Sequence, residues 1–126
     1  MEGPTVRFDR RHGILRVEVE GESSLENTMA YWHVIEDEVR RAPVPAILLV
    51  DRLRGSALTA EHWKRLVDAL AGHGLERVRI AHVKPLGLQQ IEYCELFARE
   101  AGFQARVFDS EVPAGLWLRY GEVDED

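Results

Sequence analysis

Two side chains of the types used in catalysis stand near the ends of apolar, strand-like segments. Asp51 follows the continuously apolar run 46–50, and His82 lies near the end of the run 78–83. At such positions a carboxylate could bind a metal ion or accept a proton, and an imidazole could act as a ligand or transfer a proton. Simpler roles are more usual, because aspartate often accepts hydrogen bonds from loop amides and buried histidines are often structural.

Basic residues gather beside these two positions. Arg52 and Arg54 flank a loop that leads into a predicted helix, and Lys84 follows the run that contains His82. Together they could hold an anion, because a helix N-terminus already favours negative charge. The alternative is a solvated basic loop. Gly55 alone does not make a phosphate-binding loop, which needs the pattern Gly-x-x-x-x-Gly-Lys-Ser/Thr.

The spacing of the histidines and the cysteine gives little support to metal or thiol chemistry. The five histidines form no His-x-x-x-His or His-x-His pair, and Cys94 is the single cysteine. We therefore expect no metal site built from ligands close in sequence, and no cofactor. Cys94 has no basic residue in its local helical turns, so we expect an inert thiol rather than a nucleophile.

The elements that position these residues follow from hydrophobic periodicity. Alternating runs predict two hairpin strands, and a continuously apolar run predicts a central strand. Apolar residues repeating every three to four positions predict helices, and Ser23 and Thr59 have the spacing of N-caps for the first two. The strands are predicted at 5–10, 14–20, 46–50, 78–83 and 105–108; a polar loop at 51–58; and helices after Ser23, after Thr59, over 88–101 and after Ser110.

This order, β-β-α-β-α-β-α-β-α, predicts an α/β fold with a mixed five-stranded sheet. The first strand should lie antiparallel at one edge, and the other four should run parallel. Charged hairpin residues such as Arg16 and Glu18 need a wet face, so helices should lie mainly on the other face. That face should bury Leu15, Val17, Met29, Trp32, Trp63, Leu66 and Trp117. We expect one domain over 1–121 and a frayed acidic tail over 122–126.

Composition limits the classes of function. The chain has 126 residues and a net charge of −6, which argues against nucleic-acid binding because that needs a basic surface. No apolar run approaches the roughly 20 residues of a membrane span. The N-terminal residues lack the apolar run of a signal peptide, and a single cysteine suits a reducing compartment. These features predict a cytoplasmic protein.

Several segments resemble the bacterial SpoIIAA-like proteins, which belong to the fold group of the STAS domains. The resemblance rests on His12-Gly13-Ile14-Leu15, Ile47-Leu48-Leu49-Val50-Asp51, Val78-Arg79-Ile80-Ala81-His82-Val83, Arg106-Val107-Phe108-Asp109 and Ala114-Gly115-Leu116-Trp117-Leu118. It covers nearly the whole chain and implies a non-catalytic regulatory or protein-interaction module. Because lipid-binding domains share the wider fold group, a small carrier for an apolar ligand is the alternative, and an enzyme using Asp51 and His82 is the third interpretation.

The resemblance also implies a candidate site for phosphorylation or partner binding. Family members that act as phospho-switches carry an Asp-Ser pair at the start of the helix after the third strand. Here the stretch 55–61 reads Gly-Ser-Ala-Leu-Thr-Ala-Glu, so the pair is absent, although Ser56 and Thr59 supply hydroxyls nearby. We expect both residues at or just before the helix N-terminus, exposed to a partner.

The partner is expected to be another protein or a second copy of the chain, with a homodimer slightly favoured. Exposed sheet edges invite pairing, and tyrosine is favoured at interfaces. The expected surface includes the N-terminal hairpin, Tyr31 or Tyr120, because both tyrosines lie off the main apolar stripes.

Overall fold

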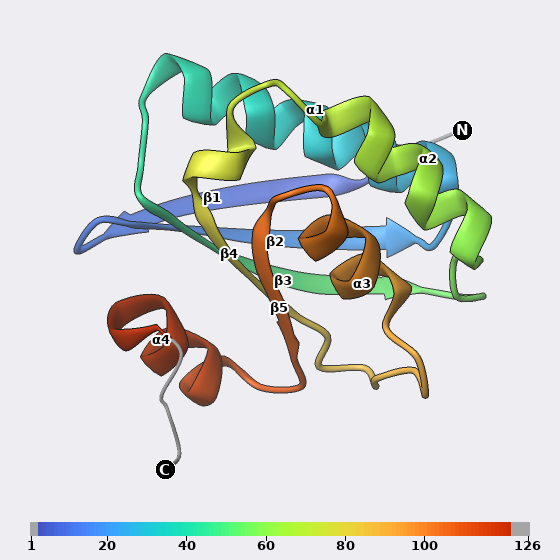
Figure 1. Ribbon diagram of the computed structural model, residues 1–126. Coiled ribbons are helices and arrows are strands. Elements are labelled where there is room, and N and C mark those ends of the chain that lie inside the picture. Colours follow the sequence, from blue (N-terminus) through green and yellow to red (C-terminus); the bar gives the residue numbers. More distant parts are fainter. Residues whose placement is uncertain (1–2, 122–126) are drawn as a thin grey trace, which may run out of the picture.

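The computed structural model describes residues 3–121, and these form one mixed sheet with helices on both faces (Figure 1). The sheet has five strands in the order β1-β2-β3-β4-β5, with β1 antiparallel to β2 and all other pairs parallel. The predicted fold class and strand order are therefore confirmed. The strands are β1 Thr5–Arg11, β2 Ile14–Glu22, β3 Ala46–Arg54, β4 Arg79–Val83 and β5 Gln104–Phe108. The predicted tail, 122–126, lies outside the described residues.

Three helices cover one face of the sheet and the fourth covers the other (Figure 1). Helices α1 (Leu25–Arg41), α2 (Ala60–Leu70) and α3 (Tyr93–Glu100) share a face, and α4 (Glu111–Tyr120) lies opposite; a short 3-10 turn, η1 (Leu75–Arg77), precedes β4. The prediction that Trp117 packs with the other tryptophans is wrong. Trp117 belongs to α4 and packs against residues such as Leu48 and Val50 on the second face.

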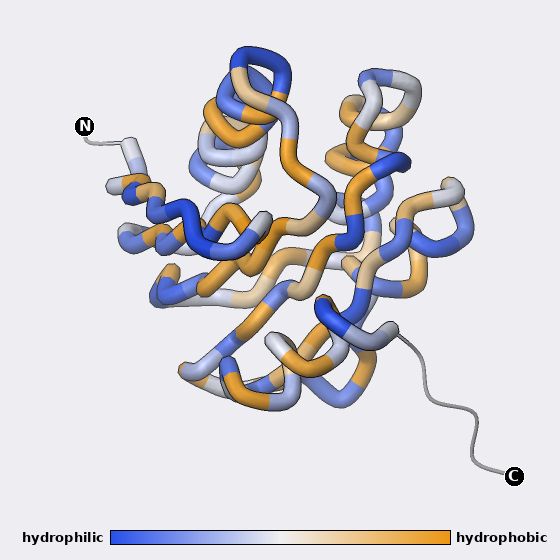
Figure 2. The backbone as a smooth tube through the Cα atoms, turned by 90° about the vertical axis from the view of Figure 1, so that its left-hand side faces the viewer, coloured by the Kyte–Doolittle hydropathy of each residue, from blue (hydrophilic) through white to orange (hydrophobic). Residues whose placement is uncertain are grey.

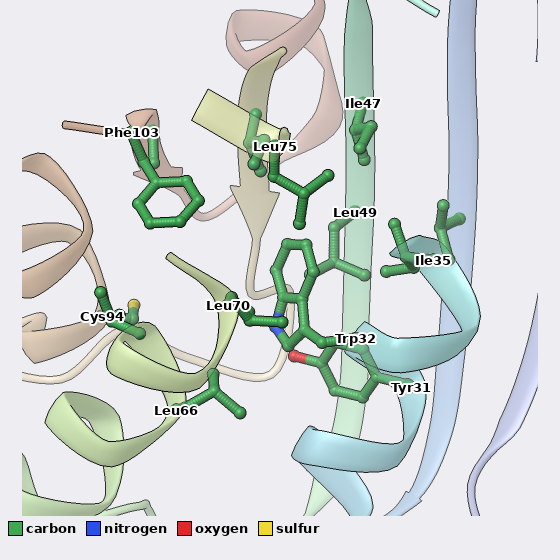
Figure 3. Close-up of a cluster of buried hydrophobic side chains, with 14 of the residues drawn as sticks. Tyr31, Trp32, Ile35, Ile47, Leu49, Leu66, Leu70, Leu75, Cys94 and Phe103 are labelled. Carbon is green, nitrogen blue, oxygen red and sulfur yellow. The ribbon is translucent and has the colours of Figure 1, made fainter. Parts of the chain in front are cut away.

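Strand β3 shows how the sequence builds the two faces. Ile47 and Leu49 point into the main core under α1 to α3, whereas Leu48 and Val50 point into the smaller core under α4. Both sets are buried, so the strand is continuously apolar rather than alternating. In Figure 2 hydrophobic segments, drawn in orange, run through the central strands. Figure 3 shows the main core, where Ile47 and Leu49 face side chains from three different elements.

The charged face of the hairpin is partly covered at the start of α4. Arg16 donates two hydrogen bonds to the Glu111 carboxylate, of 3.0 and 2.9 Å, and a third of 3.1 Å to Glu18. Arg52 donates to the other oxygen of Glu18 over 2.8 Å. Hydrogen bonds from Arg16 and Arg52 lower the pKa of Glu18. The charged side chains thus satisfy one another beside α4 instead of facing only water.

Several strand ends differ from the predicted ones by one or two residues, and three larger differences bear on the site. Strand β3 continues to Arg54, because residues 51–54 still pair with β2, so the predicted polar loop starts later. Helix α3 begins at Tyr93 rather than Leu88. The N-cap of α1 is Ser24, whose hydroxyl accepts the amide of Asn27, rather than Ser23. Thr59 caps α2 as predicted, and its hydroxyl accepts the amide of His62 over 3.1 Å.

Candidate functional site

The carboxyl ends of β3 and β4 bring Asp51 and His82 together. The two strands are parallel neighbours with Leu49 opposite His82, so Asp51 lies on the same face and two residues further along. The His82 Nε2 and Asp51 Oδ2 atoms are 2.9 Å apart, and the two side chains are only 6% and 14% exposed. The two residues singled out for their chemistry therefore form one buried pair.

Burial makes this pair depend on mutual charge compensation. Burial alone disfavours the Asp51 carboxylate, but the hydrogen bond and charge of His82 and the amide of Leu53 outweigh it, so the pKa of Asp51 is lowered. Burial likewise disfavours protonated His82, yet Asp51 and Cys94 raise the pKa of His82 to about 9. Both shifts favour an imidazolium–carboxylate pair at neutral pH.

A second buried pair lies beside the first, formed by Lys84 and Glu92. The Lys84 ammonium contacts Glu92 Oε1, and both side chains are largely buried, at 12% and 15% exposed. Lys84 also stands 5.5 Å from the centre of the Trp63 ring. Glu92 accepts the amide of Gln89, which holds the loop before α3 in a non-helical form and explains the late start of that helix.

Cys94 lies among these groups. Its thiol donates to Glu92 Oε1 over 3.6 Å, and its side chain interacts with His82. The prediction that no basic residue lies near Cys94 in its own helix turns is compatible with this arrangement. Both cations come from β4 and the residue that follows it, and only the fold brings them to α3.

Tyr31 completes the buried set and corrects another prediction. It was expected at a surface for association, but it is fully buried on the inner face of α1. Burial, followed by the charge of Asp51, raises the pKa of the Tyr31 hydroxyl well above its usual value. Tyr31 therefore packs beneath the site, and it is too buried to contact a second chain.

Above the buried pairs lies an open pocket of about 420 Å³. It is lined by the segments that connect β2 to α1, β3 to α2 and β4 to α3, with Asp51, Trp63 and Lys84 at its base. Arg54 lies at its rim and is exposed, and its guanidinium makes no hydrogen bond or ion pair with any residue in 3–121, although its carbonyl accepts the Ser23 amide over 2.7 Å. Arg52 does not contribute, because it points to the opposite face and binds Glu18. Of the predicted anion group, Arg54 and Lys84 share the pocket and Arg52 is separated from it.

Ser56 and Thr59 lie beside this pocket, both exposed, at the entrance to α2. The Thr59 hydroxyl is occupied by its capping bond. The Ser56 carbonyl accepts the Ser23 hydroxyl over 2.7 Å, which ties this loop to the start of α1. The Ser56 hydroxyl makes no hydrogen bond within residues 3–121, so of the two it is the more available for modification.

A second cavity lies below, between the sheet and helices α2 and α3. Its volume is about 50 Å³, and its walls are mostly apolar, with Trp32, Trp63 and Phe103 among them. His82 and Cys94 also line it, and Trp63 lines both this cavity and the polar pocket above.

No group of three or more His, Cys, Asp or Glu side chains in residues 3–121 is arranged to hold a metal ion. In the same range no helix has the length and apolar content needed to cross a bilayer. A scan against protein-family models finds no match, and a search of curated protein sequences finds none. The function must therefore be argued from the geometry of the site.

Proposed function

We propose that this chain is a non-catalytic regulatory or protein-interaction module of SpoIIAA-like type. In this proposal the pocket at the carboxyl edge of the sheet is its binding surface. The observation that carries it is the 420 Å³ pocket, formed by three connecting segments at the edge where open α/β sheets bind their ligands. The buried polar groups beneath it favour binding over catalysis, because Asp51, His82, Lys84 and Glu92 are already engaged with one another.

The chemistry of the rim favours an acidic group on the partner. Arg54 offers an uncompensated guanidinium, and the N-termini of α1 and α2 open towards the same side. A carboxylate or phosphate on a partner protein would gain a charge-assisted, bidentate contact from Arg54. The pocket has room for one such side chain together with its neighbours, while the exposed loop around Ser56 would lie against the partner's surface.

Replacing Arg54 with glutamate is expected to weaken partner binding by about tenfold or more, because attraction becomes repulsion at the rim. Wild-type protein, Arg54→Glu and the control Arg77→Glu are immobilised, and bound proteins from cell extract are quantified by isotope ratio. Arg77 is also exposed and unpaired within 3–121 but precedes β4, at the other end of the sheet. If wild type and both variants retain the same proteins equally, the binding surface is not at Arg54.

The alternative, a carrier for an apolar ligand, depends on the lower cavity. At about 50 Å³ that cavity is far smaller than the several hundred Å³ typical of small-molecule sites. A lipid would have to displace α2 or α3. A native mass spectrum of freshly purified protein separates the two functions, because a co-purifying apolar molecule would favour the carrier and a bare chain would favour the interaction module.

We also propose self-association through α4. Val112, Leu116 and Tyr120 are spaced four residues apart and are 75%, 50% and 72% exposed, so they form one apolar stripe. The edge strand β1 is a weaker candidate, because its exposed side chains are mostly charged. A second copy would cover the stripe with its own, as in a two-fold dimer.

Sedimentation at micromolar concentration should therefore show a dimer rather than the 14.4 kDa chain. Leu116→Ser should raise the dissociation constant about tenfold or more. The matched change Leu96→Ser removes a leucine that is 55% exposed on α3 and should have no effect. A monomeric wild type would contradict self-association, and equal weakening by both variants would contradict the proposed surface.

A further inference from the structure

A second open pocket lies at the amino edge of the sheet, at the end away from the pocket that contains Arg54. Each strand from β2 to β5 contributes its first residue, and neighbouring ones pair across the sheet: Ile14, Ala46, Arg79 and Gln104. These residues line a pocket of about 320 Å³, together with the turn between β1 and β2 and the end of α4. Figure 1 shows that turn and the link from α1 to β3 at the same end of the sheet.

The side chains around this pocket carry positive charge. Arg77, Arg79 and Arg119 line it, whereas no aspartate or glutamate of residues 3–121 does. Arg77 and Arg119 are exposed, and neither guanidinium makes a hydrogen bond or ion pair in the described part of the chain. Three cations therefore share one space without a counter-charge, although the whole chain has a net charge of −6. An anion bound between them would relieve their mutual repulsion.

Arg79 is held in place by the end of α4. Its Nη1 atom donates to the carbonyls of Trp117 and Leu118 over 3.4 and 3.2 Å, and its guanidinium lies 5.6 Å from the centre of the Trp117 ring. Gly121 permits this approach, because a Cβ atom there would lie only 3.2 Å from Arg79 Nη2. These partners are uncharged, so they fix the guanidinium without neutralising it. A side chain that is already fixed loses little entropy when it binds a ligand.

The remaining walls favour a small organic anion. Ile14, Pro45 and Leu118 add apolar surface beside the arginines, and the volume is within the range of small-molecule sites. A phosphate group offers several acceptor oxygens, so it can bind more than one guanidinium at once. The net charge of −6 disfavours an anionic membrane or a polynucleotide and leaves a small soluble ligand.

We propose that this pocket binds a small soluble phosphate ester. The phosphate lies among Arg77, Arg79 and Arg119, and the organic group packs on the apolar wall. The site is independent of the pocket at the carboxyl edge, so it gives the proposed interaction module a ligand in addition to its partner.

Calorimetric titration with phenyl phosphate tests the proposal, and inorganic phosphate is the probe that lacks the ring. At pH 8 both carry about two negative charges, so they differ mainly in the apolar group. Phenyl phosphate should bind at one site per chain and about fivefold or more tighter than inorganic phosphate, because its ring buries apolar surface. No binding of phenyl phosphate at millimolar concentration overturns the proposal, and equal affinity for both probes overturns the assignment to an ester.

Arg119→Gln and Arg77→Glu should each weaken the binding of phenyl phosphate by about tenfold or more, because each removes charge-assisted hydrogen bonds. Both residues are exposed, so the fold should tolerate the changes. The matched control, Arg65→Gln, changes an exposed arginine on α2 and should keep the wild-type affinity. Equal weakening by all three would be a general charge effect and would overturn the site. Arg77→Glu should still retain the proteins that Arg54→Glu loses, so the two sites are tested separately.

The acidic residues that follow α4 in the sequence are the competing occupant. A variant that neutralises them should bind phenyl phosphate as the wild type does; its changes are Glu122→Gln, Asp124→Asn, Glu125→Gln and Asp126→Asn. If phenyl phosphate binds to this variant and not to the wild type, the chain's own carboxylates fill the pocket and the external ligand is overturned.

Discussion

Replacement of Asp51 by alanine is expected to lower the free energy of unfolding by about 3–5 kcal/mol, as for other buried ion pairs that lose one partner. The loss is large because His82 is only 6% exposed and would keep a buried charge without its carboxylate. The amide of Leu53 would also lose its acceptor. Urea unfolding followed by tryptophan fluorescence measures the change, since Trp63 stands against His82.

The matched control is Asp37→Ala. Asp37 pairs with Arg40 on the outer face of α1, but its side chain is 77% exposed, so the change should stay below about 1 kcal/mol. A double variant, Asp51→Ala with His82→Leu, should recover part of the loss because it removes the stranded charge along with its partner. If Asp51→Ala destabilises the protein no more than Asp37→Ala, the pair is hydrated and the buried-pair interpretation fails.

The architecture followed from periodicity, because burial on one or both faces of a strand leaves a direct pattern in the chain. The alternation of Leu15, Val17 and Val19 marks a strand covered on one side, and the run 46–50 marks one covered on both. No pattern in the sequence indicates which face of the sheet α4 covers. Its apolar stripe, with Trp117, would look the same on either face of the sheet.

The candidate site was predictable only where strand order determines it. Asp51 and His82 end neighbouring parallel strands, so their meeting follows from topology. Cys94 was missed because its cationic neighbours come from β4 and the residue after it, not from its own helix. A helix start placed at Tyr93 would have signalled its position, since residues that open helices after parallel strands face the same edge. Tyr31 was wrongly predicted to be exposed because it lies off the apolar stripe of α1. The helix buries a face wider than that stripe, and this face includes Tyr31.

The second large effect is the dependence of stability on pH. The pKa of His82 rises from an ordinary 6.5 to about 9 on folding. Below pH 6.5 both folded and unfolded chains are protonated there, so the stabilisation is fully present. Between pH 6.5 and 9 the unfolded chain releases the proton while the folded chain keeps it, and the stabilisation fades. The fall should be on the order of 3 kcal/mol by pH 9 to 10.

Asp51 has the opposite dependence, because its pKa is lowered on folding. Its contribution is present above its ordinary value of 3.8 and is lost as pH falls further, so stability should be greatest between about pH 4 and 6.5. Urea unfolding from pH 4 to 10 measures the profile, and the NMR titration of His82 measures its pKa directly. Cys94 also interacts with the His82 ring, so comparison with a His82 variant is needed to isolate the contribution of His82.

His82→Gln should remove most of the fall above pH 6.5, and His12→Asn should keep it. His12 is an exposed turn residue with a positive φ of 52°, a conformation that asparagine accepts, so this control changes a histidine without disturbing the fold. A wild-type profile that is flat from pH 6.5 to 9 would mean that His82 is neutral in the folded protein. In that case Asp51 would accept a hydrogen bond from an uncharged imidazole, and the pair would be polar rather than ionic.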